Sequence, residues 1–338
     1  MGFYNVSIAG IAHIDAPIVV TSAQLCERLA PTMARLGLRA DLLASASGVV
    51  ERRWWPVGTQ PSQAATQAAE EVLRTTGIAR DKIGILINTS VCRDYIEPST
   101  ACIVHGNLGL GSHCLNFDVG NACLAFMNGM DIAGHMLERG QIDYALIVDG
   151  EGSRFVQEST IARLASDTAT ETEFREQFAT LTLGSGAAAM ILGRSELLPD
   201  GHRFLGGVSR AATQHHGLCK GQLDKMVTDA KTLLFAGLEL AGHTWQHAVA
   251  TLGWQAAHID EFVLHQVSGT HTNSLCRTLG LDMAKVLAIY PQFGNIGPAS
   301  VPIVLSKAVQ AGRIKTGSRV ALMGIGSGLN CSMAEVVW

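Results

Sequence analysis

The order of apolar and polar positions along the chain predicts strands that alternate with helices. Short apolar runs have the character of strands buried on both faces; they span residues 85–87, 145–148, 187–192, 262–264 and 320–323. Between Leu124 and Arg139 apolar residues recur every three or four positions, which predicts an amphipathic helix that ends at Gly140. Strands and helices that alternate in this way indicate an α/β fold with helices packed against sheets.

The pattern repeats at about half the length of the chain. Residues 120–150 and 294–326 both begin with Gly-Asn, continue through a helical pattern to Gly-x-Ile, and end in an apolar strand followed by glycine. Such self-similarity indicates an internal duplication. We therefore expect two halves, residues 1–194 and 195–338, that pack as one body because no low-complexity linker separates them. The polar stretch near residues 151–178 is interpreted as an excursion from the first half.

The composition allows a large core and argues against nucleic acid as a partner. Of the 338 residues 47% are hydrophobic and 16% are charged, and the formal net charge is −4. One basic and aromatic cluster, residues 52–55, is interpreted as a solvated helix or loop face rather than a platform for stacked bases. We expect neither a signal peptide nor a membrane span, because no apolar run has the length for either.

The eight cysteines are scattered along the chain and form no Cys-x-x-Cys pair; they are Cys26, Cys92, Cys102, Cys114, Cys123, Cys219, Cys276 and Cys331. Scattered thiols in a chain without an export signal are expected to stay reduced, so we predict a cytoplasmic protein. His215-His216 and the pair His265 and His271 have no cysteine or acidic neighbours at the spacing of metal ligands. We therefore expect no metal site.

Cys123 stands where a strand over residues 114–119 gives way to the helix predicted from Leu124. A thiol at this position would lie beside the unpaired N–H groups and the positive end of the helix dipole. Both favour the thiolate, which is the form that attacks acyl groups. The alternative is a buried structural cysteine, which is what most free cysteines are.

Three further polar groups lie at strand ends or glycine-rich turns, where side chains can converge. His265 follows a strand, Asn295 precedes a helix, and Ser327 lies in Gly-x-Gly-Ser-Gly after a strand. Taken singly, they are also consistent with a strand-end histidine, a turn asparagine and a tight hairpin. Because Asn295 takes the place of Asn121 in the repeat, the duplication should bring it near Cys123 across the centre of the molecule.

Together these groups resemble the thiolase superfamily. Cys123 stands in Asp-Val-x-x-Ala-Cys and His265 in Val-Leu-His-Gln. Asn295 stands in Gly-Asn-x-x-x-Ala-Ser-x-Pro, and Ser327 in the last glycine-rich motif, Gly-x-Gly-Ser-Gly. The order and spacing are similar to the type III β-ketoacyl synthase branch, over essentially the whole chain. The resemblance implies the thiolase fold, an internally duplicated α/β structure with five layers in the order αβαβα, and an acyltransferase that needs no cofactor.

The resemblance also implies a role for each of these residues. Cys123 would attack the thioester of an acyl-CoA, and its own N–H and that of Ser327 would stabilise the oxyanion. His265 and Asn295 would hold the enolate oxygen of a second substrate.

Within the superfamily the chain departs from the synthases that use a malonyl-carrier protein. Residues 46–49 lack the arginine that is usual there, and His265-Gln266 is followed by Val267-Ser268 instead of Ala-Asn. Cys123 is followed by Leu124-Ala125 rather than by smaller residues. These differences argue against the use of malonyl groups and carrier protein.

Three other segments, residues 88–100, 121–131 and 294–306, resemble the members that join two fatty acyl-CoA molecules head to head. That reaction is the first step of bacterial long-chain olefin biosynthesis. The resemblance implies a non-decarboxylative Claisen condensation that gives a 2-alkyl-3-ketoacyl product, a long-chain β-keto acid after hydrolysis, through an acyl-Cys123 intermediate. The implied partners are fatty acyl-CoA substrates and downstream enzymes of the olefin pathway.

A condensation without decarboxylation needs a base for the α-proton, and the resemblance implies Glu97 in this role. Glu97 would reach in from the partner subunit of a homodimer, whose surface would include its loop and the strand over residues 115–119. The alternative is that Glu97 stands at a helix start before Pro98, where a carboxylate is favourable in any case.

Two other functions stay open at this stage. One is a type III β-ketoacyl-acyl-carrier-protein synthase or a related acyltransferase. The other, from a different class, is an acyl-CoA-binding or thioesterase-like protein, in which Cys123 takes up an acyl group that water then removes.

Overall fold

The computed structural model describes residues 2–338, and its framework is a nine-stranded sheet in the order β11-β12-β13-β8-β1-β7-β6-β4-β5. In chain order these strands are β1 (Val6–Asp15), β4 (Ile83–Asn88), β5 (Leu115–Asp118), β6 (Tyr144–Glu151), β7 (Gly186–Arg194), β8 (His202–Ala211), β11 (Glu261–Leu264), β12 (Arg319–Gly326) and β13 (Asn330–Val337). The apolar runs of the sequence all fall within these strands, which confirms the expected α/β class.

The sheet consists of two similar parts that meet at β1 and β8. These two strands are paired only at Ser7 with Arg203 and at Ile8 with His202. The pairing of strands follows the same sequence in both parts, counted outward from this contact. In β1-β7-β6-β4 the first two pairs are antiparallel and the third is parallel. The same holds for β8-β13-β12-β11. A duplicated unit would produce this arrangement. The boundary at residue 194 stays a prediction, which the strand order supports.

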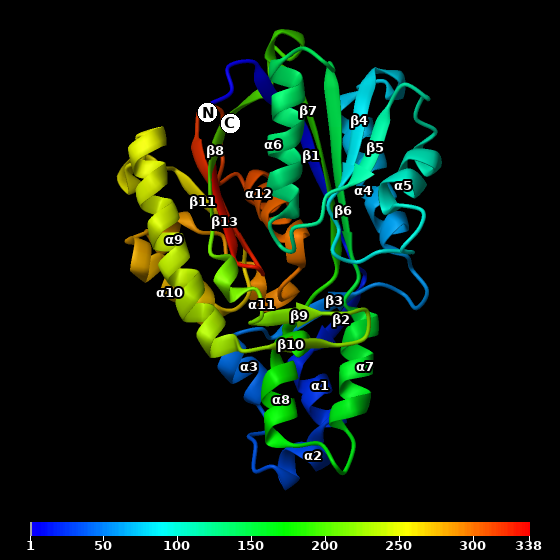
Figure 1. The fold of residues 1–338 in the computed structure, drawn as a ribbon, viewed down its shortest axis with the longest axis vertical. Helices are drawn as coiled ribbons and strands as arrows, with labels where there is room; N and C mark the ends of the chain where they lie inside the picture. Colours follow the sequence, from blue (N-terminus) through cyan, green and yellow to red (C-terminus); the bar gives the residue numbers. More distant parts are fainter. Residues whose placement is uncertain (1) are drawn as a thin grey trace.

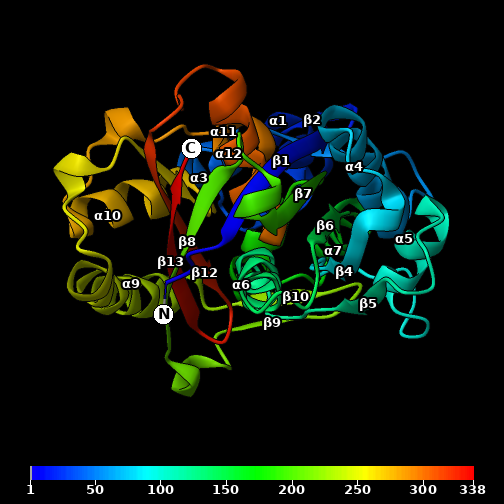
Figure 2. The ribbon, with the colours of Figure 1, turned by 90° about the horizontal axis from the view of Figure 1, so that it is seen from above.

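Helices lie between the two parts of the sheet and on their outer faces. Figures 1 and 2 show α6 and α12 in the middle, α4 and α5 outside one part, and α9 and α10 outside the other. The layers therefore follow the expected order of helix, sheet, helix, sheet and helix. The bounds of these helices are α4 (Pro61–Thr76), α5 (Thr100–Leu108), α6 (Ala125–Glu138), α9 (Ala230–Leu252), α10 (Gly269–Leu279) and α12 (Ser300–Gln310).

The central layer, formed by α6 and α12, is apolar because a part of the sheet covers each of its faces. In α12 the residues from Val301 to Leu305 are all buried, as expected of a helix enclosed on every side. Burial of each large aliphatic side chain there contributes roughly 1.5–3 kcal/mol to the stability of the fold. The helix that opens beside Cys123 and the helix that follows Asn295 therefore belong to one buried hydrophobic core.

The lower part of Figure 1 is a smaller cluster of short helices around two small two-stranded sheets, β2-β3 and β9-β10. Its elements are β2 (Ile18–Thr21), α1 (Ser22–Arg28), α2 (Ala30–Arg35), α3 (Leu42–Ser47), β3 (Glu51–Trp54), α7 (Arg154–Leu164), α8 (Glu171–Gln177), β9 (Cys219–Gly221), β10 (Met226–Thr228) and α11 (Tyr290–Phe293). The expected excursion near residues 151–178 supplies α7 and α8 to this cluster. Glu151, however, is the last residue of β6.

The expectation that residues 52–55 form a solvated face was wrong. Arg52 has no exposed surface, and both tryptophans are buried. The guanidinium donates to the carbonyls of Val20 and Leu181 and to the hydroxyl of Ser22, at 3.2, 3.1 and 2.9 Å. Burial lowers the pKa of Arg52 to about 10. The side chain thus joins the two-stranded β2–β3 sheet to the segment around residue 181.

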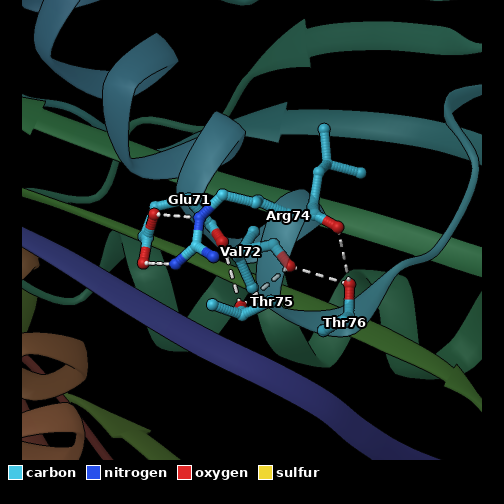
Figure 3. Close-up of polar contacts among 6 residues, drawn as sticks. Glu71, Val72, Arg74, Thr75 and Thr76 are labelled. Carbon is cyan, nitrogen blue, oxygen red and sulfur yellow. Dashed lines mark hydrogen bonds and ion pairs between the residues drawn. The ribbon is translucent and has the colours of Figure 1, made fainter.

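The end of α4 illustrates how local sequence stops a helix (Figure 3). The hydroxyls of Thr75 and Thr76 donate back to the carbonyls of Glu71 and Val72, at 2.9 and 2.7 Å. Gly77 then takes the left-handed conformation, with φ of +68°. An open hollow of about 830 Å³ lies over this helix end, away from Cys123.

Across residues 2–338, no helix combines the length and the apolar character that a bilayer crossing needs.

Candidate active site

Cys123 lies in a tight turn between β5 and α6. The residue before it, Ala122, has φ of +46° and is the one non-glycine residue with positive φ among residues 2–338. This conformation costs an L-residue about 1–2 kcal/mol. The N–H groups of Leu124 and Ala125 donate to the carbonyls of Asn121 and Ala122, both at 3.1 Å. The helix begins at Ala125, so Cys123 stands just before its first turn rather than within it.

The surroundings of Cys123 hold it as a thiol. Burial, followed by the charge of Glu151, raises the pKa of Cys123 to about 12. The expectation that the helix terminus favours a thiolate is not met. A helix dipole contributes about 0.3–1 kcal/mol, which is less than the cost, on the order of 4 kcal/mol, of a pKa that rises from 9 to about 12. The thiol therefore has to lose its proton during its reaction.

The glycine-rich turn that carries Ser327 packs directly on the Cys123 turn. A Cβ on Gly326 would stand 2.9 Å from the carbonyl oxygen of Asn121, closer than side chains pack. Asn330 completes this contact, since its amide nitrogen donates to the side-chain oxygen of Asn121 at 3.0 Å. The two turns approach each other this closely because position 326 has no side chain.

His265 is brought to the same place by β11 and β12. Its N–H donates to the carbonyl of Met323 at 2.8 Å, one residue before the glycine-rich turn. The imidazole is buried, and burial together with the neighbouring His271 lowers its pKa to about 3. His265 is therefore neutral near pH 7, and its Nδ1 has no hydrogen-bond partner within the described chain.

Asn295 is fixed by the turn that follows α11. Gly294 has φ of +65°, and the backbone N–H of Asn295 donates to the carbonyl of Thr182 at 3.0 Å. Its side-chain oxygen accepts from the N–H of Gly297 at 3.0 Å. The amide nitrogen is consequently the end of the side chain that can donate to a substrate.

Two contacts join these segments into one site. The N–H of Gln266, next to His265, donates to the hydroxyl of Ser300 at the start of α12. The short 3-10 helix Gly297–Ala299, which follows Asn295, packs against α6. The turns that carry Cys123, His265, Asn295 and Ser327 are thus mutually packed, as the sequence predicts.

Glu97 stands apart from this group in the single chain. It lies in the loop between β4 and α5, its side chain is exposed, and within residues 2–338 it forms no hydrogen bond or ion pair. Glu97 stands two residues before Ser99, which caps α5 by accepting from the N–H of Cys102 at 3.1 Å, so Glu97 is not itself the cap of this helix. Glu97 is free to meet another chain.

Three groups near the site were not predicted from the sequence. His271, which sequence reasoning considered only as a metal ligand, lies on the first turn of α10, and burial lowers its pKa to about 4. Asp149 and Glu151 are buried at the end of β6. The sequence feature that could have revealed Asp149 and Glu151 is their two-residue spacing at the end of a strand, which puts both carboxyl groups on one face.

No group of three or more histidine, cysteine or acidic side chains among residues 2–338 has an arrangement that could hold a metal ion.

Comparison with known proteins gives one family. The 3-oxoacyl-[acyl-carrier-protein] synthase III model matches residues 117–211, and the C-terminal model of that synthase matches residues 249–338. The chain is 58% identical to the acyl-CoA:acyl-CoA alkyltransferase of Xanthomonas campestris pv. campestris over 100% of both chains. The protein of the same name from Shewanella oneidensis is 37% identical, again over 100% of both chains.

A more distant relative and the solved structures agree with this assignment. The β-ketoacyl-[acyl-carrier-protein] synthase III of Sodalis glossinidius is 28% identical over 87% of this chain and 89% of its own. The crystal structure of cerulenin-bound Xanthomonas OleA superposes with a TM-score of 0.99, covering 100% of this chain and 98% of that chain at 58% identity.

Proposed function

The chain belongs to the acyl-CoA:acyl-CoA alkyltransferase family, the OleA enzymes of the thiolase superfamily, and we propose on this premise that it joins two fatty acyl-CoA molecules. The reaction is a non-decarboxylative Claisen condensation, and its product is a 2-alkyl-3-ketoacyl compound. The observation that carries the conclusion is 58% identity to the Xanthomonas enzyme over the full length of both chains.

The spacing of the site residues supports their roles. Crystal structures exist of Xanthomonas OleA with a single glutamate, cysteine or histidine replaced. The glutamate and the cysteine there are separated by the same interval as Glu97 and Cys123 (123 − 97 = 26). The cysteine and the histidine are separated by the same interval as Cys123 and His265 (265 − 123 = 142).

In the first half of the reaction Cys123 takes up an acyl group. Its sulfur attacks the thioester carbon of the first acyl-CoA, the carbon–sulfur bond to CoA breaks, and the thiol proton leaves with CoA. The N–H groups of Cys123 and Ser327 donate to the oxyanion. Each such fixed donor typically contributes about 10²-fold or more to the rate.

In the second half a carbon–carbon bond forms. Glu97 of the partner subunit removes an α-proton from a second acyl-CoA, and the enolate oxygen accepts from His265 and Asn295. The α-carbon then attacks the acyl carbonyl, the bond to Cys123 breaks, and the released sulfur regains the proton that Glu97 removed, which restores both groups. Neutral His265 suits this role, since it can donate one hydrogen bond without a formal charge. Hydrolysis of the product thioester gives the β-keto acid.

A homodimer supplies Glu97 to the opposite site. β5 is the last strand of the sheet on its side, and Leu115 and Phe117 on it are exposed. Tyr95 and Ile96, beside Glu97, are also exposed, with 90% of the Ile96 surface open. Contiguous exposed apolar residues and an unpaired strand edge are typical of a protein interface.

The proposed setting is the cytoplasm, with olefin-pathway enzymes that consume the β-keto acid downstream. All eight cysteines are free, which suits a reducing compartment.

Substrate choice tests this proposal against the carrier-protein synthases and against hydrolysis. Purified protein given one long-chain acyl-CoA should release CoA and form the β-keto product, measured by mass spectrometry. Cys123→Ala should form neither. A product that appears only when malonyl-carrier protein is added would overturn the proposal, and so would free fatty acid as the sole product.

A further inference from the structure

Two buried carboxyl groups lie on the side of β6 that faces Cys123. Successive strand residues point to opposite faces, so Asp149 and Glu151 share one face while Gly150 faces α4. The backbone at Gly150 touches α4 so closely that a Cβ there would stand 2.2 Å from the carbonyl oxygen of Pro61. Asp149 has no exposed surface and Glu151 only 5%. The mechanism above assigns a role to neither.

Glu151 connects two loops of the site. Its Oε1 accepts from the N–H of Val91 at 2.6 Å, where the loop that carries Glu97 begins. Cys92, the next residue, acts on the pKa of the same carboxyl group. On the other side a Cβ on Gly297 would stand 3.4 Å from Cδ of Glu151, so the turn after Asn295 packs on the same carboxyl group.

The charges around Glu151 are acidic or neutral. Asp149 on its own strand, Cys92 on the loop and Cys123 before α6 are the titratable groups that face it. Asp149 accepts from the hydroxyl of Thr89 at 2.6 Å through one oxygen, and its other oxygen has no partner within residues 2–338. Two neighbouring carboxyl groups in such a place cannot both be ionised at low cost.

We propose that Glu151 is a positioning residue, whose carboxyl group holds the Asn295 turn beside Cys123 and anchors the start of the loop that presents Glu97 to the partner subunit. The inference rests on the proposed condensation, because it acts through the base and the enolate donor of that reaction. It has a second consequence that does not depend on condensation. When ionised, Glu151 opposes formation of the Cys123 thiolate, and burial raises the pKa of Glu151 to about 7.

Two substitutions separate the contacts of Glu151 from its charge. Glu151→Gln keeps an oxygen that can accept from Val91 but removes the charge, whereas Glu151→Ala removes both. Glu158→Gln, on the exposed side of α7, is the matched loss of one charge outside the site. All three proteins are compared with wild type in first-turnover CoA release, yield of β-keto product, and the pH profile of Cys123 alkylation by iodoacetamide.

Alkylation of Cys123 at pH 8–10 should be faster in Glu151→Gln than in wild type, by about threefold or more. Glu151→Ala should lose about tenfold or more of its β-keto yield per acyl group loaded, and Glu151→Gln should lose less. Glu158→Gln should match wild type in every measurement. An alkylation profile of Glu151→Gln equal to wild type would overturn the effect of the Glu151 charge on Cys123, and a wild-type yield of β-keto product in Glu151→Ala would overturn its positioning role.

The alkylation assay needs no condensation, so it tests Glu151 even if wild type makes no β-keto product. That absence of product would contradict the proposed function instead. If Glu151→Ala does not fold, Glu151→Asp replaces it, because this change keeps the charge but shortens the reach to Val91. It should lose β-keto yield and keep the wild-type alkylation profile, and a wild-type yield would overturn the positioning role.

Discussion

At the scale of single residues, the site joins a cysteine held as a thiol to a histidine held neutral. Burial acts on both, since it raises the pKa of Cys123 to about 12 and lowers that of His265 to about 3. A preformed thiolate–imidazolium pair is therefore absent from the resting site. In the proposed reaction Cys123 loses its proton only as it attacks the thioester, and His265 serves as a neutral hydrogen-bond donor.

The buried histidines should make the folded protein sensitive to acid. The folded-state pKa values of about 3 for His265 and about 4 for His271 lie below the ordinary value of 6.5. Their contribution to stability is thus fully present above pH 6.5 and is lost as the pH falls towards 4 and 3. His271→Asn should reduce the fall in the free energy of unfolding between pH 6.5 and 4, by up to about 1.4 kcal/mol per pH unit.

Urea denaturation at several pH values measures this slope. His258→Asn, at an exposed position, is the control and should keep the wild-type slope. A slope in His271→Asn as steep as in wild type would mean that His271 is not kept neutral by the fold.

At the scale of elements, glycines and turns bring the site residues together. The Cys123 turn and the glycine-rich turn of Ser327 touch through backbone atoms at Gly326. Their contact fixes the two N–H groups proposed as oxyanion donors. The geometry of acylation therefore depends on this backbone contact as well as on the side chains.

Gly326→Ala tests this dependence. The added Cβ would stand 2.9 Å from the carbonyl oxygen of Asn121, so one of the two turns must shift. We expect a loss of stability of about 1–3 kcal/mol and a slower first-turnover release of CoA. Gly242→Ala in α9 is the matched control, since its Cβ meets no atom within 4 Å, and it should be neutral or slightly stabilising. CoA release in Gly326→Ala at the wild-type rate would refute the role of this contact.

The elements were predictable from the sequence where the local pattern determines them. The strand over residues 145–148 and the helix over residues 124–139 have clear apolar patterns, and both exist with shifts of one to three residues at their ends. The flanking motifs predicted which turns meet around Cys123. The repeat predicted a second, similar part of the sheet.

Other features could not be predicted because they depend on distant partners. Arg52 is buried because acceptors more than a hundred residues away, such as the carbonyl of Leu181, approach it. The sequence pattern placed Glu151 at the start of a polar segment. Its contact with the turn after Asn295 is visible only in the folded structure. The pKa of Cys123 likewise depends on enclosure by the whole fold, which a helix-terminus argument omits.

At the scale of the whole molecule, the proposed nucleophile and the proposed base of one chain lie apart. The described chain leaves Glu97 exposed beside an apolar edge strand, while the Cys123 site lies between the two parts of the sheet. The proposed dimer resolves this separation by exchange of Glu97 between subunits.

Mixed dimers test the exchange. Cys123→Ala and Glu97→Gln should each abolish condensation, but a dimer with one subunit of each keeps one complete site. Random mixing makes half of the dimers mixed, so denaturing and refolding the two together should restore about a quarter of wild-type activity. If Glu97 acted within its own subunit, no mixed dimer would have a complete site and activity would stay at the level of the separate variants.

The central claim is that two acyl groups enter one product, and isotope mixing tests it most directly. The purified protein is given equal amounts of an unlabelled acyl-CoA and its fully ¹³C-labelled form, and the product is analysed by mass spectrometry. The account predicts a β-keto product in three forms, unlabelled, half-labelled and fully labelled, with the half-labelled form about as abundant as the other two together. Products that carry only one acyl group, either unlabelled or fully labelled, would contradict it.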